Sequence, residues 1–167
     1  ALGSIGRIDG EAEGIDATPL AGGDLHVLTI DVAVVPIRLI ALDVRSGAER
    51  WRHTTGDWVY GSPAIADGRV FIGSYDGNFQ ALDLATGAVR WTHDAGGRIS
   101  GSATVIDGIV YTSILYREGQ PRKTWGLDVR TGAVRWQNDD GRYSPAVGAG
   151  DTVYIVGTKL LRAYRTR

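Results

Sequence analysis

Three histidines are the side chains best suited to acid–base or metal chemistry: His26, His53 and His93. His53 and His93 each stand two residues after a tryptophan, so both occupy one place in a recurring pattern, which favours a structural role. No two histidines have the spacing usual for metal ligands. The chain has no cysteine, which excludes disulfides, thiolate metal sites and a cysteine nucleophile. We therefore expect no metal site.

The serines and aspartates that could serve as nucleophiles or bases also recur at equivalent positions of the pattern. Ser62, Ser102 and Ser144 stand at equivalent positions, and no Gly-x-Ser-x-Gly segment is present. Most aspartates fall at predicted turns. Gly96-Gly97 opens no predicted helix, so a phosphate-binding loop is excluded. Because a repeating fold explains these residues, we predict no catalytic residue and no resident cofactor.

The charge and hydrophobicity of the chain limit the classes of function that it can have. The 167 residues include 18 basic and 19 acidic side chains, for a formal net charge of -1. Nucleic-acid-binding proteins usually carry a basic excess, so we expect no nucleic-acid partner. No segment approaches the ~20 apolar residues of a membrane-spanning helix. The absence of cysteine is compatible with an extracytoplasmic location, periplasmic or secreted, and we predict that location.

A sequence unit of roughly forty residues recurs along the chain. Its most regular part ends in a tryptophan, and the tryptophans Trp51, Trp91 and Trp136 are 40 and 45 residues apart. A second block alternates with the first and begins at Thr18-Pro19, Ser62-Pro63, Ser102-Ala103 and Ser144-Pro145. The chain therefore contains four copies of the unit, and 1–167 is predicted to be a single domain built from these copies, with no second domain.

Each copy predicts four short strands joined by tight turns. In the second copy the predicted strands are 63–66, 69–74, 78–83 and 88–93, with Asp67-Gly68, Asp76-Gly77 and Thr86-Gly87 between them. Asp-Gly between apolar runs is a strong hairpin signal because both residues tolerate positive φ. Four antiparallel strands per ~40 to 45 residues are typical of a propeller blade. We predict an all-β chain without helices.

The recurring motif has a physical explanation. The Asp and Thr side chains can accept hydrogen bonds from turn amides, and glycine supplies the unusual dihedral angle. The tryptophan lies on the outermost strand and can pack against a neighbouring blade where the facing residue is small. The motif residues are Ala41, Asp43, Gly47 and Trp51; Ala81, Asp83, Thr86, Gly87 and Trp91; and Gly126, Asp128, Thr131, Gly132 and Trp136.

The pattern Ala-x-Asp-x-x-Thr-Gly-x-x-x-Trp resembles the tryptophan-docking repeat of the pyrroloquinoline-quinone (PQQ) dehydrogenase-like β-propellers. The resemblance covers nearly the whole chain. It implies a β-propeller whose family includes quinoprotein alcohol and glucose dehydrogenases. It equally implies non-enzymatic relatives, namely a lipoprotein of the outer-membrane barrel-assembly machine and sensor domains of bacterial serine/threonine kinases.

The expected blades cover about 17–57, 61–97, 101–140 and 143–167. The fourth copy stops before its outer strand, and segment 3–9, which has the spacing of an outer strand, is predicted to complete a blade. Three architectures fit: a closed four-bladed ring, two chains joined as an eight-bladed ring, or half of a longer chain. The resemblance implies rings of seven or eight blades, so we favour two halves related by twofold symmetry. The expected partner is then a second copy or the missing half.

Function is expected where the copies differ. Loops from each outer strand to the next blade, and loops between second and third strands, share one face of a propeller. Aromatic residues and arginine are enriched at protein interfaces. The candidate binding residues on this face are Trp58, Tyr60, Tyr75, Arg98, Tyr116, Arg142, Tyr143 and Lys159.

Three hypotheses for function follow. We favour a non-enzymatic scaffold that binds a protein or peptide through the loop face. The alternative is a PQQ-dependent dehydrogenase or a fragment of one; the resemblance would then imply bound PQQ, a calcium ion, an aspartate base and often a vicinal cysteine pair. A ligand-sensing domain of a receptor or kinase is the third.

Overall fold

The computed structural model describes residues 20–32, 35–115, 122–141, 146–149, 151–157 and 160–165. These residues form fifteen β-strands and no helix. The strands make four separate antiparallel sheets, each built from consecutive strands in chain order. The prediction of an all-β chain with four repeated antiparallel units is therefore confirmed.

The first two sheets each have four strands. The first contains β1 (Leu20–Gly22), β2 (Leu25–Val32), β3 (Val35–Asp43) and β4 (Glu49–Thr54). The second contains β5 (Ala64–Ala66), β6 (Arg69–Gly73), β7 (Asn78–Asp83) and β8 (Val89–Asp94). The strands predicted for the second copy agree with β5–β8 to within one residue at each end.

The third sheet also has four strands, and the fourth has three. The third contains β9 (Thr104–Ile106), β10 (Ile109–Ser113), β11 (Thr124–Asp128) and β12 (Val134–Asn138). The fourth contains β13 (Val147–Ala149), β14 (Thr152–Val156) and β15 (Leu161–Arg165). Segment 3–9, predicted to be a further outer strand, lies outside the described residues.

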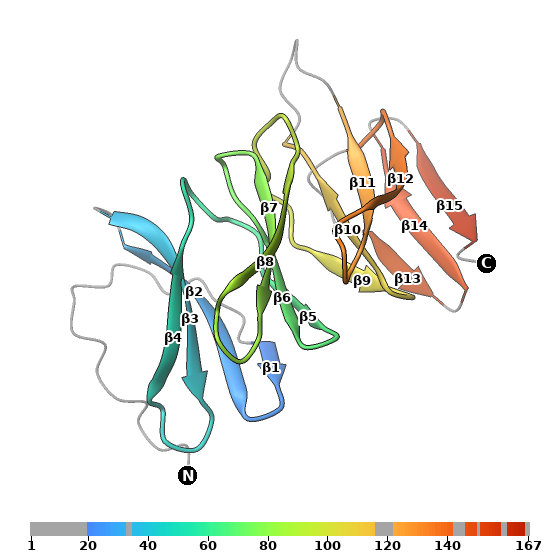
Figure 1. Cartoon of the computed structure of the whole chain (residues 1–167). Helices are drawn as coiled ribbons and strands as arrows, with labels where there is room; N and C mark the ends of the chain where they lie inside the picture. The colour runs from blue at the N-terminus through green and yellow to red at the C-terminus, as the bar shows by residue number, and fades with distance from the viewer. Residues whose placement is uncertain are drawn as a thin grey trace.

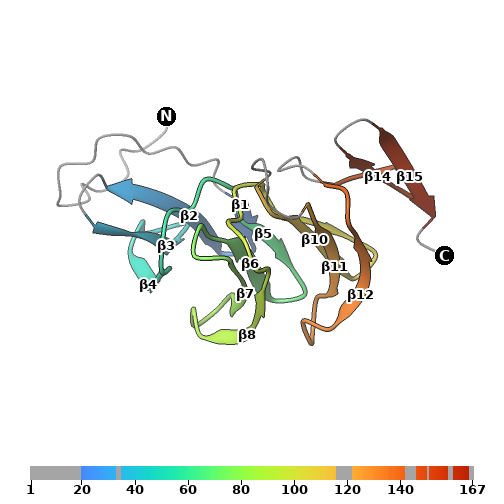
Figure 2. The ribbon, with the colours of Figure 1, turned by 90° about the horizontal axis from the view of Figure 1, so that it is seen from above.

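The four sheets stand side by side in chain order (Figure 1). The sheet of β1–β4 and the sheet of β13–β15 lie at opposite ends of this row, and the view from above shows the same order (Figure 2). The described sheets therefore form an open arc.

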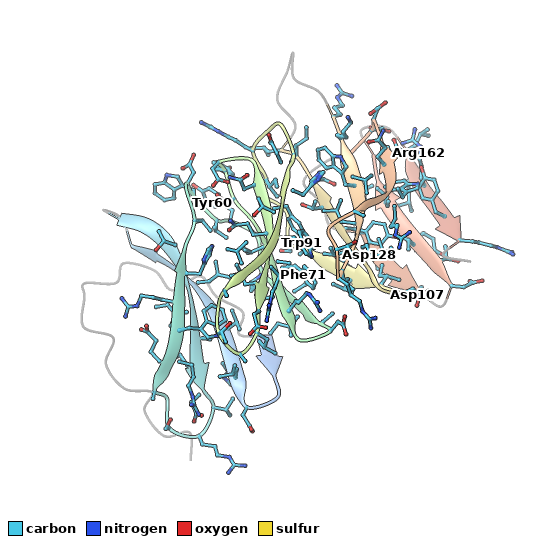
Figure 3. The ribbon with its side chains drawn as sticks, in the orientation of Figure 1. Tyr60, Phe71, Trp91, Asp107, Asp128 and Arg162 are labelled. Carbon is cyan, nitrogen blue, oxygen red and sulfur yellow. The ribbon has the colours of Figure 1, made fainter. Side chains whose placement is uncertain are left out.

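The apolar core is divided among the spaces between neighbouring sheets. Phe71 and Phe79 of the second sheet pack with Ile99 and Leu127 toward the third, and all four side chains are fully buried. Trp91 joins this cluster, with its ring centroid 5.8 Å from that of Phe71 (Figure 3). Burial of large apolar side chains between sheets is the main stabilising term, so each sheet depends on its neighbour.

The motif turns are closed by their aspartates, as the sequence predicts. Asp83 Oδ1 accepts hydrogen bonds from the backbone N–H of Ala85 and Thr86 and from the Thr86 hydroxyl. Gly87 follows with φ of 71°. The second oxygen, Oδ2, accepts a hydrogen bond from the Arg90 guanidinium at 2.6 Å. Sequence reasoning did not identify this ion pair, which the structure adds.

Two tryptophans connect successive sheets. The Trp51 indole Nε1–H donates to the Leu84 carbonyl of the second sheet at 2.8 Å. Its ring lies so close to Gly87 that a Cβ there would stand 2.7 Å from Cδ2. Trp91 repeats this contact on the third sheet, at the Val129 carbonyl and at Gly132. The motif glycine thus serves two needs, a positive φ and a flat surface for the neighbouring indole.

We predict that Gly87→Ala destabilises the chain more than Gly47→Ala. Both glycines have φ near 70°, so both alanines adopt a left-handed conformation at a cost of about 1–2 kcal/mol. Only Gly87 has the indole of Trp51 against it, whereas no described atom lies within 4 Å of a Cβ built at Gly47. Displacing the indole should add about 1–3 kcal/mol. Urea denaturation measures both; equal losses would show that the indole contact is unimportant.

We also predict that stability falls in acid because of the motif aspartates. Hydrogen bonds from Arg90 to Asp83 and from Arg135 to Asp128 lower each pKa from 3.8 to about 2. The unfolded chain then binds protons more readily than the folded chain. Stability from these groups is complete above about pH 4 and is lost as the pH falls through about 2. Asp83→Asn should lower stability at neutral pH and flatten its decline below pH 4, measured by urea denaturation at each pH; an unchanged slope contradicts this.

Candidate binding surface on the loop face

Loops of two kinds meet at one end of the sheets. The β4–β5 and β8–β9 loops lead from an outer strand to the next sheet, and the β6–β7 turn joins the middle strands of the second sheet. Tyr60 marks this end, and Asp107 and Asp128 lie toward the other (Figure 3). We call the end with Tyr60 the loop face.

Three aromatic side chains gather on the loop face, and we call them the aromatic cluster: Trp58, Tyr60 and Tyr75. The rings of Trp58 and Tyr60 are nearly parallel, with centroids 6.0 Å apart. Tyr75 lies 4.8 Å from Tyr60 on a tilted plane. Trp58 is 43% exposed and Tyr60 60% exposed, although aromatic rings of this size are usually buried in a monomer.

Arg98 adds a positive charge to the aromatic cluster. Its guanidinium carbon lies 5.3 Å from the centre of the Tyr75 ring, within the range of a cation–π contact. Arg98 is exposed, and the structure gives it no ion pair with a carboxylate among the described residues. Its charge is therefore directed to solvent or to a ligand.

Backbone contacts fix the loop that carries Trp58 and Tyr60. The Tyr75 N–H donates to the Trp58 carbonyl at 2.7 Å, which ties the β4–β5 loop to the β6–β7 turn. Hydroxyls of Thr55 and Ser74 both donate to the Asp57 carbonyl. Val59, between the two exposed aromatics, is buried. The backbone beneath the aromatic cluster is therefore held by both sheets.

The loop that carries Arg98 is anchored in the same way. The Ile99 N–H donates to the Ser74 carbonyl, and the Leu115 N–H donates to the Arg98 carbonyl. Ile99 itself is fully buried. It packs so closely on Gly73 that a Cβ at position 73 would clash with it. Arg98 and the aromatic cluster are thus presented by a preorganised backbone.

The carboxylates near the aromatic cluster accept hydrogen bonds from backbone amides. Asp57 Oδ1 accepts a hydrogen bond from the Trp58 N–H. Asp76 accepts hydrogen bonds from the N–H groups of Gly56 and Asn78. Burial works to raise the pKa of Asp76, but these hydrogen bonds more than offset it and lower the pKa below its ordinary value. Both carboxylates therefore act as turn-makers here.

Of the predicted binding residues, the structure brings together Trp58, Tyr60, Tyr75 and Arg98. Four others, Tyr116, Arg142, Tyr143 and Lys159, lie outside the described residues. Sequence reasoning did not select Lys123, whose ammonium lies 5.8 Å from the Trp125 ring centre. Trp125 occupies the position that Gln80 holds in the second sheet. This departure from the repeat is the sequence signal that could have identified Trp125 and its neighbour Lys123.

Histidines and acids do not converge on this surface. Within the described ranges, no three His, Cys, Asp or Glu side chains form a group that could hold a metal ion. The same ranges contain no helix with the length and apolar character needed to span a membrane.

Solved structures share the fold. A quinohemoprotein alcohol dehydrogenase, ADHIIG from Pseudomonas putida HK5, matches with a TM-score of 0.74 and 20% identity, over 86% of this chain and 28% of that one. BamB from Moraxella catarrhalis matches with a TM-score of 0.67 and 21% identity, over 86% and 43%. The chain therefore spans less than half the length of these two propellers, one an enzyme and the other BamB.

A designed protein matches this chain over nearly the full length of both chains. The computationally designed Ika4 protein matches with a TM-score of 0.66 and 15% identity, over 92% of this chain and 94% of that one. No curated protein sequence matches the chain. In contrast, the family described as "Outer membrane protein assembly factor BamB" matches residues 11–161. The chain belongs to this family of PQQ-like β-propellers.

Proposed function

We propose that the chain is a non-enzymatic binding module that captures a protein or peptide on its loop face. The observation that carries this proposal is the aromatic cluster beside Arg98. Two of its rings are exposed to solvent, at 43% and 60%, and its backbone is fixed by hydrogen bonds to neighbouring sheets. Exposed aromatic side chains on a rigid surface are unfavourable in water and are characteristic of an interface.

The residue types favour a protein or peptide ligand. Trp, Tyr and Arg are the side chains that most often dominate protein-binding energy. Because the loops are held in place before binding, little conformational entropy is lost when a partner docks. The exposed charge of Arg98 favours a partner segment that carries a carboxylate beside an apolar or aromatic group.

Two further points belong to this proposal. We place the protein outside the cytoplasm, which is supported by the family's description as an outer membrane assembly factor. We also propose that further blades complete the ring, from a second copy or from the rest of a longer chain. The open arc of four sheets and the partial coverage of the natural propellers support this.

The loop face can be tested with a triple variant, Trp58→Ala, Tyr60→Ala and Arg98→Ala. Peptides selected from a random 12-residue library on the unmodified chain should bind the variant at least about a hundredfold more weakly, since each hot-spot side chain contributes more than about 1 kcal/mol. Titration with fluorescently labelled peptide measures the affinity. The unfolding free energy should fall by no more than about 1–3 kcal/mol, because Tyr60 is largely exposed and Trp58 is only partly covered.

A matched triple variant serves as the control: Val89→Ala, Val134→Ala and Arg45→Ala. These residues are also exposed and lie outside the loop face. The control should retain full peptide affinity. If no peptide is enriched, or if both variants bind equally, the assignment of the loop face is wrong. Saturable binding of PQQ with calcium at micromolar concentration, followed by PQQ absorbance, would instead favour the dehydrogenase alternative.

A further inference from the structure

His93 is a titratable side chain in the contact between the second and third sheets. It belongs to β8, and its ring centroid lies 5.2 Å from that of Trp125 in β11, with the two ring planes at 70°. Trp125 is buried and belongs to the apolar cluster between these sheets. The imidazole of His93 therefore packs against the core of this contact.

One ring nitrogen of His93 is buried without a hydrogen bond. Nε2 is closed to solvent and has no hydrogen-bond partner among the described residues. A neutral imidazole can keep Nε2 as a bare acceptor, whereas an imidazolium carries an N–H donor on both nitrogens. Protonation would therefore place a charged donor without an acceptor inside the sheet contact, which is unfavourable.

The equivalent histidine of the first sheet has a partner. His53 and His93 occupy the same register position in β4 and β8. His53 Nε2 lies 2.9 Å from Oε1 of Gln80 in the second sheet. In the third sheet Trp125 occupies the position of Gln80, so His93 meets an indole where His53 meets an amide. The tryptophan removes the acceptor that an imidazolium needs.

The charged groups near His93 come from its own strand and from the third sheet. Asp94 follows it in β8 and is exposed. Lys123 directly precedes β11, and its ammonium lies 5.8 Å from the centre of the indole that His93 contacts. This ammonium has Asp139 as a counter-ion at 4.0 Å. In β7, the residues around the position paired with His93 are 78–80, which carry no charge.

Burial is the main influence on the pKa of His93. It lowers the pKa below the ordinary value of 6.5, while Asp94 works to raise it and the Lys123 ammonium to lower it. The unfolded chain therefore binds a proton at this histidine more readily than the folded chain. Stability from neutral His93 is complete above about pH 7.5 and is lost as the pH falls toward the lower pKa of the folded chain.

The loop that carries Arg98 begins directly after β8, and its position depends on the third sheet. The Leu115 N–H donates to the Arg98 carbonyl, and the neighbouring Ile114 N–H donates to the Lys123 carbonyl. The Arg98 loop and the segment that carries Lys123 are thus held by consecutive amides of one strand end. The packing of the end of β8 against the third sheet therefore positions Arg98 on the loop face.

We propose that His93 is a pH-sensitive contact between the second and third sheets that controls the loop face. Neutral His93 packs against Trp125 and holds the start of the β8–β9 loop in place. The imidazolium turns to solvent, because its buried position offers Nε2–H no acceptor, and the loop that carries Arg98 loosens. A partner is then bound at neutral pH and released in mild acid. The control of binding rests on the proposed function, whereas the contact itself does not.

Urea denaturation between pH 8 and pH 5 tests the contact itself. Asp83 and Asp128 stay ionised in this range, because their pKa values are about 2. Histidine is the side chain that ordinarily titrates here. The equilibrium constant for unfolding should rise at least about threefold from pH 8 to pH 5. His93→Gln should remove most of this rise, since glutamine gains no charge; an equal rise in the variant and the unmodified chain overturns the proposal.

The matched control is His53→Gln, at the equivalent position of the first sheet. This variant keeps His93, so the rise in the unfolding constant should persist. If His53→Gln removes as much of the rise as His93→Gln does, the effect does not belong to the unpartnered ring, and the proposal is wrong.

NMR titration of the imidazole signals gives a readout that does not depend on unfolding. The chain has three histidines, so the signal of His93 is the one missing from His93→Gln. Its pKa should lie below 6.5. Lys123→Gln should raise this pKa, because the ammonium beside the same indole is removed. A pKa of His93 at or above 6.5 in the unmodified chain contradicts the proposal.

Peptide affinity separates the control of the loop face from the contact. A histidine-free peptide selected on the unmodified chain at pH 7.5 should bind at least about fivefold more weakly at pH 5.5, a typical lower value for coupling between sites. His93→Gln should bind this labelled peptide equally at both pH values. Equal affinity of the unmodified chain at both pH values overturns the control of the loop face. If no peptide is selected, the proposed function fails, while the urea and NMR measurements still decide whether His93 is a pH-sensitive contact.

Discussion

The indole of one sheet lies flat on a glycine of the next, and the arrangement of the sheets depends on this contact. Trp51 meets Gly87 and Trp91 meets Gly132 with no room for a Cβ. Each indole N–H also donates to a carbonyl of the sheet that it contacts. One side chain thus fixes both the separation and the relative height of two sheets, which gives successive sheets a similar offset.

The same contact makes every sheet dependent on a neighbour. Phe71, Phe79 and Ile99 are buried only because a second sheet faces them. A sheet at the end of the row has no such cover, and the exposed Tyr154 and Leu161 show the consequence. Among the described sheets, the burial of these side chains therefore depends on contact between neighbouring sheets.

The strands are similar from sheet to sheet, whereas the loops that connect them carry different side chains. Trp58 and Arg98 occupy equivalent places, since the carbonyl of each accepts a backbone N–H from the following sheet. One place carries an indole and the other a guanidinium, so a single backbone arrangement presents different chemistry at successive positions. This separation of framework and surface explains how BamB and an alcohol dehydrogenase can share one fold.

The sequence by itself determined the four repeated units, their strands and the residues that close their turns. Local signals suffice for these, because Asp83, Thr86 and Gly87 act on their own turn. The tertiary structure alone decided that Gly87 supports Trp51 and that Arg90 pairs with Asp83. It also decided that, on the face predicted from the sequence, Tyr75 contacts both Tyr60 and Arg98. Such contacts join residues that the strand pairing and the offset between sheets bring together, and no local pattern encodes those distances.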